Sequence, residues 1–413
     1  MNCLIINKRS VVHYLLLYLL IISQGSVLFG INQDICIILI LILSCYFIVL
    51  KRVRLEKGFS YFIIILFVCL GMVSFITNGS LSIASVLNVC SNFFLAYIAY
   101  GYDKKNFPTR FVKITTILSI IGLIMFAVQI VNFGLIKALL PQYIHSGYIF
   151  YGQLLFSATE YPHLTKNIGL ATEPGRHQIY LIAAIYVCVF KEQLLNVSEK
   201  VKKRCLIILI IALITTQSTT GYISLAILII GRLLINLKNK NNTQTSKTIN
   251  RVIIIMLVVV IGYLLVSGEN NLIQRIIINK LFDSTGKVDF TVSTGGSRVG
   301  SMLTDLSIAI KNPLGLGFEK YQSLWANSKI GYFLDTASCS GLTISCAALG
   351  FPATIIMIGY YIYCEIKNIP NNIEKIVLVL ILINLSLSQP SFYYAPMIVC
   401  FMINSKRCLR EGD

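Results

Sequence analysis

The stretch IILILILSCYFIVL, residues 37–50, decides the fold class. It contains no charged side chain, and its apolar residues do not alternate with polar ones. A strand of a membrane barrel would alternate with a period of two, whereas a helix crosses about 30 Å of hydrocarbon with roughly 20 mostly apolar residues. Similar blocks recur along the chain, separated by short polar clusters. The pattern predicts an all-α fold, a polytopic transmembrane helical bundle forming a single integral membrane domain over residues 1–413.

The composition supports this prediction. The chain is 56% hydrophobic and 13% charged, with a mean hydropathy of +0.77, whereas a soluble protein carries about a quarter charged residues. The formal net charge of +18 does not indicate nucleic-acid binding, because the basic residues lie in the hinges between apolar blocks and do not form one face. We therefore expect a lipid bilayer, and no nucleic acid, as a partner.

The apolar blocks predict about twelve crossings, and the basic residues predict their orientation. The crossings fall at about 11–29, 34–50, 59–77, 81–100, 111–131, 173–190, 205–217, 220–236, 252–267, 341–363, 376–389 and 393–404. One set of hinges holds 25 of the 35 Lys and Arg residues. Because cytoplasmic hinges carry the excess of Lys and Arg, we expect this set, and both termini, on the cytoplasmic side.

Two outer segments, about 132–172 and 268–340, are too long to be simple turns. Connections longer than roughly 15 residues are usually functional or disordered. These two contain aromatic residues, glycines and amphipathic stretches such as 269–283, which favours a large, partly helical outer loop. We expect the active site on this side of the membrane.

The stretch GLATEPGRHQIYLI, residues 169–182, places charges at the start of the sixth crossing. Thr172 or Glu173 suits the N-cap and Pro174 the first helical position, so Arg176 falls in a first turn whose unpaired N–H groups favour an anion such as phosphate. His177 shares a helix face with Glu173. The alternative is an interfacial Glu–Arg pair whose guanidinium reaches for water.

The stretch TGGSRVGSMLTDLSIAIKNPLGLGFEKY, residues 294–321, predicts a second such helix start. Ser297 can cap a helix that begins at Arg298 and ends before Pro313. Its buried face would be the apolar row Leu303, Leu306 and Ile310. Two outward arginines at two helix starts can share a pyrophosphate, and the alternative is two independent surface arginines.

Further residues are candidates for substrate contact. Tyr143, His145 and Tyr148 lie in an aromatic stretch that suits a sugar ring, although interfacial aromatic residues are also normal. Gln217 and Tyr393 lie in polar turns between crossings and can line a cavity. The chain has no GxxxxGK phosphate loop, HExxH zinc pattern or DxD pair. We therefore expect no cofactor and no metal, and a substrate that is already activated.

Three motifs carry a resemblance to a known family: GLATEPGR (169–176), TTQSTTGYISLAILII (215–230) and SRVGSMLTDLSIAIKNPLGLGF (297–318). With these motifs and the large outer loop, the chain resembles the O-antigen polymerases (Wzy type) of the O-antigen ligase and polymerase superfamily of membrane glycosyltransferases. The resemblance implies transfer of a chain held on undecaprenyl pyrophosphate to the next lipid-linked repeat unit, at the periplasmic face of the bacterial inner membrane. It implies a donor and an acceptor of this kind as partners, with a chain-length regulator protein as a further partner.

The resemblance also implies site roles. Arg176 and Arg298 would bind the pyrophosphates. The ligases of the superfamily carry a histidine in the large outer loop shortly before the next span, and residues 324–341 contain none, which favours a polymerase. The resemblance does not assign the general base. From the residues themselves we expect a direct displacement that inverts the sugar linkage, with Glu173 as the first choice of general base, Asp335 as the second and His177 as the third. A lipid-linked oligosaccharide flippase and an O-antigen ligase are the alternative functions.

Overall fold

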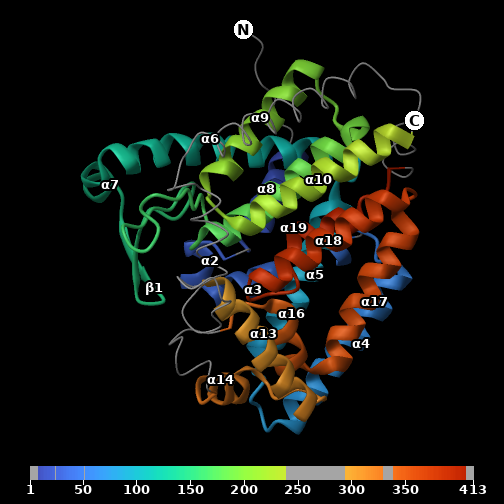
Figure 1. The fold of residues 1–413 in the computed structure, drawn as a ribbon. Coiled ribbons are helices and arrows are strands. Elements are labelled where there is room, and N and C mark those ends of the chain that lie inside the picture. Colours follow the sequence, from blue (N-terminus) through green and yellow to red (C-terminus); the bar gives the residue numbers. More distant parts are fainter. Residues whose placement is uncertain (1–7, 24, 51, 239–293, 329–337, 406–413) are drawn as a thin grey trace.

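The fold is that of a computed structural model, drawn in Figure 1. It describes the chain except residues 1–7, 24, 51, 239–293, 329–337 and 406–413. Three sequence predictions lie outside the described residues: the crossing at 252–267, the amphipathic helix at 269–283, and Asp335.

The structure confirms a mostly helical chain. The elements before residue 239 are α1 (Lys8–Ile22), α2 (Val27–Ile31), α3 (Gln33–Val49), α4 (Lys57–Ile76), α5 (Ile83–Tyr102), α6 (Phe107–Val131), α7 (Phe133–Leu139), β1 (Gln142–His145), β2 (Tyr148–Tyr151), α8 (Pro174–Phe190), the 3-10 turn η1 (Glu192–Leu194), α9 (Glu199–Thr215) and α10 (Thr219–Lys238). After it come α13 (Thr294–Lys311), α14 (Phe318–Ala326), α16 (Gly341–Ile344), the π-helical turn η3 (Ser345–Leu349), α17 (Gly350–Asn368), α18 (Asn372–Ser388) and α19 (Ala395–Met402).

Several of these helices could span a membrane. Among the described residues, α4, α5, α6, α10 and the continuous run 341–368 are long and apolar enough to cross, and α1 and α3 are shorter apolar helices. Every predicted crossing within the described ranges coincides with a helix or with consecutive helical elements. A multi-pass helical membrane protein therefore fits the structure, while the number of twelve crossings stays a prediction.

The first predicted crossing is not continuous, which corrects its expected bounds. α1 ends at Ile22 and α2 begins at Val27, with Gly25 in a left-handed conformation (φ +84°) between them. The side chain of Ser26 caps α2 by accepting from the N–H of Phe29 at 3.0 Å. These two residues interrupt the apolar run because glycine adopts the left-handed conformation without strain and the serine hydroxyl accepts a free N–H group of the next helix.

Exposure separates an outer shell of helices from a central one. α3 and α4 expose large apolar side chains, such as Ile64 and Phe75 at the surface of α4, as expected for helices that face hydrocarbon. α8 is buried along almost its whole length. It packs against α6, α9, α10 and α19 and lies in the middle of the bundle (Figure 1). The charged start of α8 is therefore carried by the most enclosed helix.

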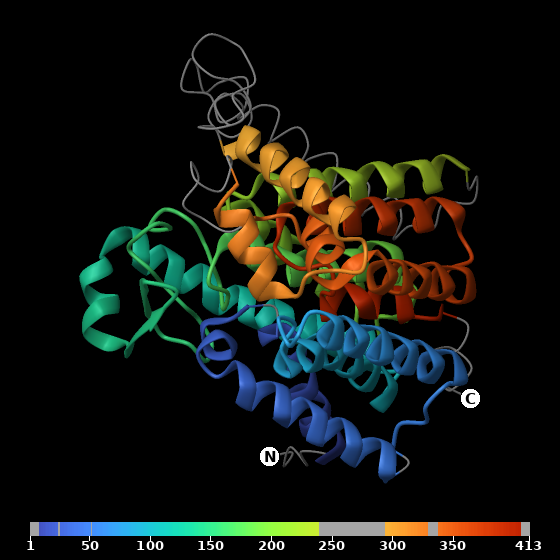
Figure 2. The ribbon, with the colours of Figure 1, turned by 90° about the horizontal axis from the view of Figure 1, so that it is seen from below.

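The segment after α6 forms a β-hairpin that the sequence reading did not predict. β1 and β2 are antiparallel, with His145 opposite Tyr148. Ser146 and Gly147 both have positive φ, the conformation that a two-residue hairpin turn requires. The hairpin and α7 project from one side of the bundle in both views (Figures 1 and 2).

α13 differs from its prediction at its start and in its buried face. It begins at Thr294, so Arg298 lies one turn inside the helix and not in its first turn. Leu303 and Ile310 are exposed, and the buried row is Ser301, Asp305 and Ala309, which follow each other at helical spacing. The physical reason is that Asp305 finds three hydroxyl donors. The end of the helix at Lys311, before Asn312 and Pro313, is confirmed.

Two ends of the bundle can be defined from helices that run between them. α1, α17 and α19 each have one end near a cavity lined by Arg9, Lys367 and Asn404. We call this the basic end. The opposite ends of α1, of the continuous helical run 341–368 and of α19 lie near Gly25, Gly341 and Tyr394, and we call this the α8 end. Since Arg9 and Asn404 line one cavity, the first and last described helices reach the same end of the bundle.

Candidate functional site

The start of α8 carries the predicted Glu–Arg pair. Glu173 occupies the N-cap position in extended conformation and Pro174 the first helical position. The Glu173 side chain does not cap the helix. It accepts instead from Arg176, whose Nε donates to Oε1 at 2.9 Å, and the two side chains are 38% and 33% exposed. The prediction that Arg176 lies in a first helical turn is confirmed, and the pair is open to a ligand.

The turn between α1 and α2 contacts this pair and fixes its position. A Cβ on Gly25 would lie 2.2 Å from Nη1 and 2.4 Å from Cδ of Arg176, so only glycine leaves room for the guanidinium there. The carbonyl of Gly25 accepts from the N–H of Thr172 at 3.0 Å and from its hydroxyl at 3.2 Å. The N-terminal segment thus fixes the position of Arg176 from about 150 residues away in sequence.

Two predicted substrate ligands lie around Arg176. The ring of His145 lies against Gly30, 2.6 Å from a Cβ built there. Burial, and second the charge of Arg176, lower the pKa of His145, so its imidazole is neutral at pH 7 and near the guanidinium. Tyr393, half-buried before α19, lies within electrostatic reach of Arg176. The structure therefore brings these two residues together with Arg176.

The other aromatic candidates lie in the hairpin. Tyr143 is half-buried and packs on a small cluster formed by Val27, Phe150 and Ile168. Tyr148 is exposed and its ring centroid is 6.0 Å from that of Tyr161. Tyr143 thus contributes to packing beside the site, whereas Tyr148 presents a free ring surface at the hairpin. Their role in sugar contact stays a prediction.

Arg298 reaches the same region from the second outer segment. The thiol of Cys339 lies within electrostatic range of both Arg298 and Glu173. Burial raises its pKa, while Arg298 lowers it and Glu173 raises it by smaller amounts. A carboxylate of the α8 start and the guanidinium of α13 therefore act on one atom. Arg298 and Glu173, the ion-pair partner of Arg176, thus both lie within electrostatic range of Cys339. That the two arginines share one ligand stays a prediction.

Lys166 is a third cation here, which the sequence reading did not select. Its pKa is lowered by burial and by the charge of Arg298, so the two cations lie close together. Within the described part of the chain, no carboxylate forms an ion pair with Lys166 or Arg298. Lys166 stands in no motif, and its position in an outer loop was the only signal.

Asp305 fixes α13 against its neighbours. It is fully buried, and its carboxylate accepts from the hydroxyls of Tyr321 at 2.6 Å, Ser338 at 2.7 Å and Thr343 at 2.7 Å. Burial raises its pKa, and the three hydrogen bonds oppose that rise. Arg298 and Asp305 are seven residues apart and so share one helix face. Asp305 therefore orients the face that carries Arg298.

The predicted ligands His177 and Gln217 both contact backbone. His177 is 1% exposed, and its Nδ1 lies 3.1 Å from the carbonyl of Asn167. Gln217 donates from Nε2 to the carbonyl of Thr165 at 3.0 Å. Their contacts hold the loop 163–169, which carries Lys166. A direct substrate contact of either residue stays a prediction.

His163 adds a neutral imidazole to this loop. Burial and, second, the charge of Lys166 lower the pKa of His163 to about 4, while Glu173 raises it by a smaller amount. Its Nδ1 is buried and has no hydrogen-bond partner among the described residues. At neutral pH the loop thus contributes one positive charge, that of Lys166, beside an uncharged histidine.

The arrangement suits an anion. Arg176, Arg298 and Lys166 supply positive charge at one end of the bundle, and of the carboxylates described there Glu173 is paired with Arg176. The described residues contain no group of three His, Cys, Asp or Glu side chains that could hold a metal ion. The cavity of about 620 Å³ at the basic end is distinct from this site.

Comparison with known proteins assigns no family to the chain. No protein-family model matches the sequence, and no curated protein matches it.

Proposed function

We propose that the chain polymerises oligosaccharide repeat units carried on undecaprenyl pyrophosphate, at the periplasmic face of the bacterial inner membrane. In this proposal both termini are cytoplasmic, the α8 end is periplasmic and the product is O-antigen or a related surface polysaccharide. The motif resemblance in 169–176, 215–230 and 297–318 supports the family, and the site's charge supports the substrate class.

One observation carries the proposal: Arg298 and Glu173, the ion-pair partner of Arg176, both lie within electrostatic range of the Cys339 thiol, with Lys166 beside Arg298. A diphosphate carries several negative charges and can accept from more than one cation. Bidentate arginine contacts and helix N-termini are the usual means of binding such groups. Two cations without a described acidic partner are costly to hold together unless an anion joins them.

The chemistry is a single displacement. The acceptor hydroxyl oxygen attacks the anomeric carbon of the donor, and the bond from that carbon to the pyrophosphate oxygen breaks. The electron pair leaves with undecaprenyl pyrophosphate, where Arg176 and Arg298 stabilise the developing charge. Oε1 of Glu173 is held by Arg176, and Oε2 takes the acceptor proton. The configuration at the anomeric carbon is inverted.

The test is complementation of a strain lacking the protein. Arg176→Ala and Arg298→Ala should each lower the rate of polymer formation by about 10²–10³-fold, the usual cost of one lost charge stabiliser. The readout is the ladder of surface polysaccharide on a gel, together with the amount of each variant in the membrane.

Lys137→Ala is the matched control, because Lys137 is an exposed cation of the same outer segment that pairs with Glu160. It should leave the ladder unchanged. A normal ladder from Arg176→Ala or Arg298→Ala at normal protein amount would contradict the proposal.

The deletion strain separates the alternatives. Loss of a polymerase leaves single repeat units attached to the lipid A core. Loss of a ligase leaves none attached, and loss of a flippase prevents units from reaching the outer face. Single attached units would support the proposal, and a core without units would overturn it.

A further inference from the structure

The basic end contains a cavity that the proposed function does not use. It encloses about 620 Å³ and is lined by the start of α1, the segment before α4, the end of α5, the start of α6 and the ends of α17 and α19. Its charged lining residues are Arg9, Arg52, Arg54, Lys104, Lys105, Arg110 and Lys367, with Glu56 and Asp103 as the acids.

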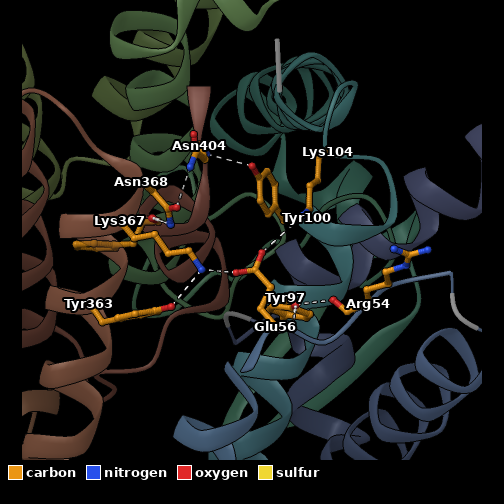
Figure 3. A network of polar contacts seen from close by, with 10 residues as sticks. Arg54, Glu56, Tyr97, Tyr100, Lys104, Tyr363, Lys367, Asn368 and Asn404 are labelled. Atoms are coloured by element: carbon orange, nitrogen blue, oxygen red, sulfur yellow. Dashed lines mark hydrogen bonds and ion pairs between the residues drawn. The ribbon is translucent and has the colours of Figure 1, made fainter. Parts of the chain in front are cut away.

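Both acids of the cavity are already paired. Glu56 lies between Lys367 and Lys104, and Lys367 also donates to the hydroxyl of Tyr363 at 3.1 Å; Figure 3 shows this arrangement. Asp103 binds Nη1 of Arg110 at 2.7 Å. The negative charge inside the cavity is therefore consumed by the protein itself.

Three cations at the rim of the cavity have no such partner. Arg52, Arg54 and Lys105 are exposed, and no carboxylate within the described ranges forms an ion pair with any of them. In Figure 3 the guanidinium of Arg54 points away from Glu56. Like charges gathered around one opening favour an anion there.

The wall of the cavity continues into apolar surface. Phe59 and Tyr97 stack at 4.0 Å between ring centroids and line the interior. On α17, Ile362 and Ile366 are exposed next to the lining residues Tyr363 and Lys367. A ligand whose anionic head enters the cavity can therefore lay an alkyl chain along α17.

We propose that this cavity binds the phosphate head group of an anionic glycerophospholipid, such as phosphatidylglycerol, with its acyl chains against the exposed apolar face of α17. Basic pockets between membrane helices on the cytoplasmic side bind acidic lipid head groups, and the predicted orientation places this end in the cytoplasmic leaflet. The adjoining apolar surface favours a lipid over a soluble phosphate.

The test is a lipid titration of the full chain in neutral detergent, followed by thermal unfolding. Phosphatidylglycerol should bind and raise the midpoint temperature of unfolding, whereas phosphatidylcholine should leave that midpoint unchanged. The triple variant Arg52→Gln, Arg54→Gln, Lys105→Gln should bind phosphatidylglycerol on the order of 100-fold more weakly, from the usual contribution of three Lys or Arg at a lipid surface.

A second triple variant, Lys113→Gln, Lys200→Gln, Arg204→Gln, is the matched control. It removes the same charge from exposed residues of the same end that do not line the cavity, and it should bind the lipid as the unchanged protein does. Equal weakening by both triples would overturn the proposal, because net charge alone would then explain binding.

Two further arms distinguish the ligand and guard the result. Glycerol 3-phosphate at matched concentration should not stabilise the protein, and stabilisation equal to that by the lipid would show a soluble ligand and overturn the proposal. The double variant Arg52→Gln, Lys105→Gln repeats the test with a smaller change, should the triple not fold. Since no polysaccharide is measured, the outcome does not depend on the proposed function.

Discussion

The two ends of the helical bundle use charge in different ways. At the basic end, carboxylates join helices through ion pairs: Lys191 with Glu374 at 2.7 Å, Arg232 with Glu192 at 2.5 Å and Arg110 with Asp103 at 2.7 Å. At the α8 end, helices and loops are joined by neutral partners, such as the hydroxyls around Asp305 and the carbonyls that bind His177 and Gln217.

The difference teaches where a ligand can gain binding energy. An ion pair that holds two helices together has its charge neutralised in place, so at the basic end a ligand can use only the rim cations Arg52, Arg54 and Lys105, which pair with no described carboxylate. Where neutral hydrogen bonds do the holding, the cations stay available, as Arg298 and Lys166 do within the described part of the chain. The predictions below test this contrast.

Breaking the buried pair at the basic end should have the largest effect. Lys191→Met leaves the carboxylate of Glu374 buried without its cation, and removing one partner of such a pair costs about 3–5 kcal/mol in the free energy of unfolding. Thermal and denaturant unfolding in detergent measures this loss. The double variant Lys191→Met, Glu374→Gln should recover most of it. A single variant as stable as the parent would show that the pair does not hold the helices.

At the α8 end, Asp305→Asn should cost less. The amide keeps one acceptor but turns an N–H toward a hydroxyl that formerly donated, and one such mismatch costs about 1–3 kcal/mol. The rate of polymer formation should fall by more than the loss of folded protein alone explains, because α13 carries Arg298. The measurement is the unfolding midpoint beside the polysaccharide ladder. An unchanged ladder with a lowered midpoint would remove Asp305 from the support of the site.

Gly25→Ala should disturb Arg176 more than the fold. A left-handed backbone costs an alanine about 1–2 kcal/mol, and the new methyl would also collide with the Arg176 side chain. Gly79→Ala is the matched control, since φ there is +79° with no atom within 4 Å of the added Cβ. Both variants should lose similar stability, and only Gly25→Ala should lose polymer, by about tenfold or more. Equal ladders would mean that Gly25 does not position Arg176.

The uncharged imidazole of His163 at the α8 end predicts a response to acid. The pKa of His163 is lowered to about 4, so below its ordinary value near 6.5 the unfolded chain takes up a proton that the folded chain refuses. The stability that His163 contributes is thus full at neutral pH and is lost as the pH falls from about 6.5 to about 4. His163→Gln should flatten the decline of the unfolding midpoint between pH 7.5 and 4.5. Parallel curves would contradict this assignment.

The smallest effect is expected at Lys137. Its exposed pair with Glu160 lies in water, where such pairs contribute little. Lys137→Ala should leave the unfolding midpoint and its salt dependence unchanged. A clear drop in the unfolding midpoint would indicate that an exposed ion pair stabilises the outer segment, contrary to the expectation that neutral hydrogen bonds hold this end.

Local signals in the sequence predicted the start of α8 well. Glu173, Pro174 and Arg176 are neighbours, and the rules for a helix start involve only such neighbours. The end of α13 at Lys311 followed in the same way from Asn312 and Pro313. Apolar blocks predicted the helices because burial in a membrane requires long apolar runs.

Contacts between distant residues could not be predicted. The partners of Asp305 lie 16, 33 and 38 residues along the chain, so an amphipathic pattern selected Leu303 and Ile310 as the buried face instead. The charge of Arg298 acts on Lys166, and Gly25 supports Arg176, only because the fold joins separate segments. The hairpin was within reach, since Ser146-Gly147 is a turn signal between alternating residues.

The short last helix has a consequence for depth. α19 has eight residues and is therefore about 12 Å long, while the hydrocarbon layer is about 30 Å thick. It leads from Tyr394, near Arg176, to Met402 in the wall of the basic cavity. In a bilayer, at least one of these polar regions must then sink below the level of the head groups. The membrane voltage would drop over this thin partition, so a charged group moving at either side would experience an unusually steep electric field.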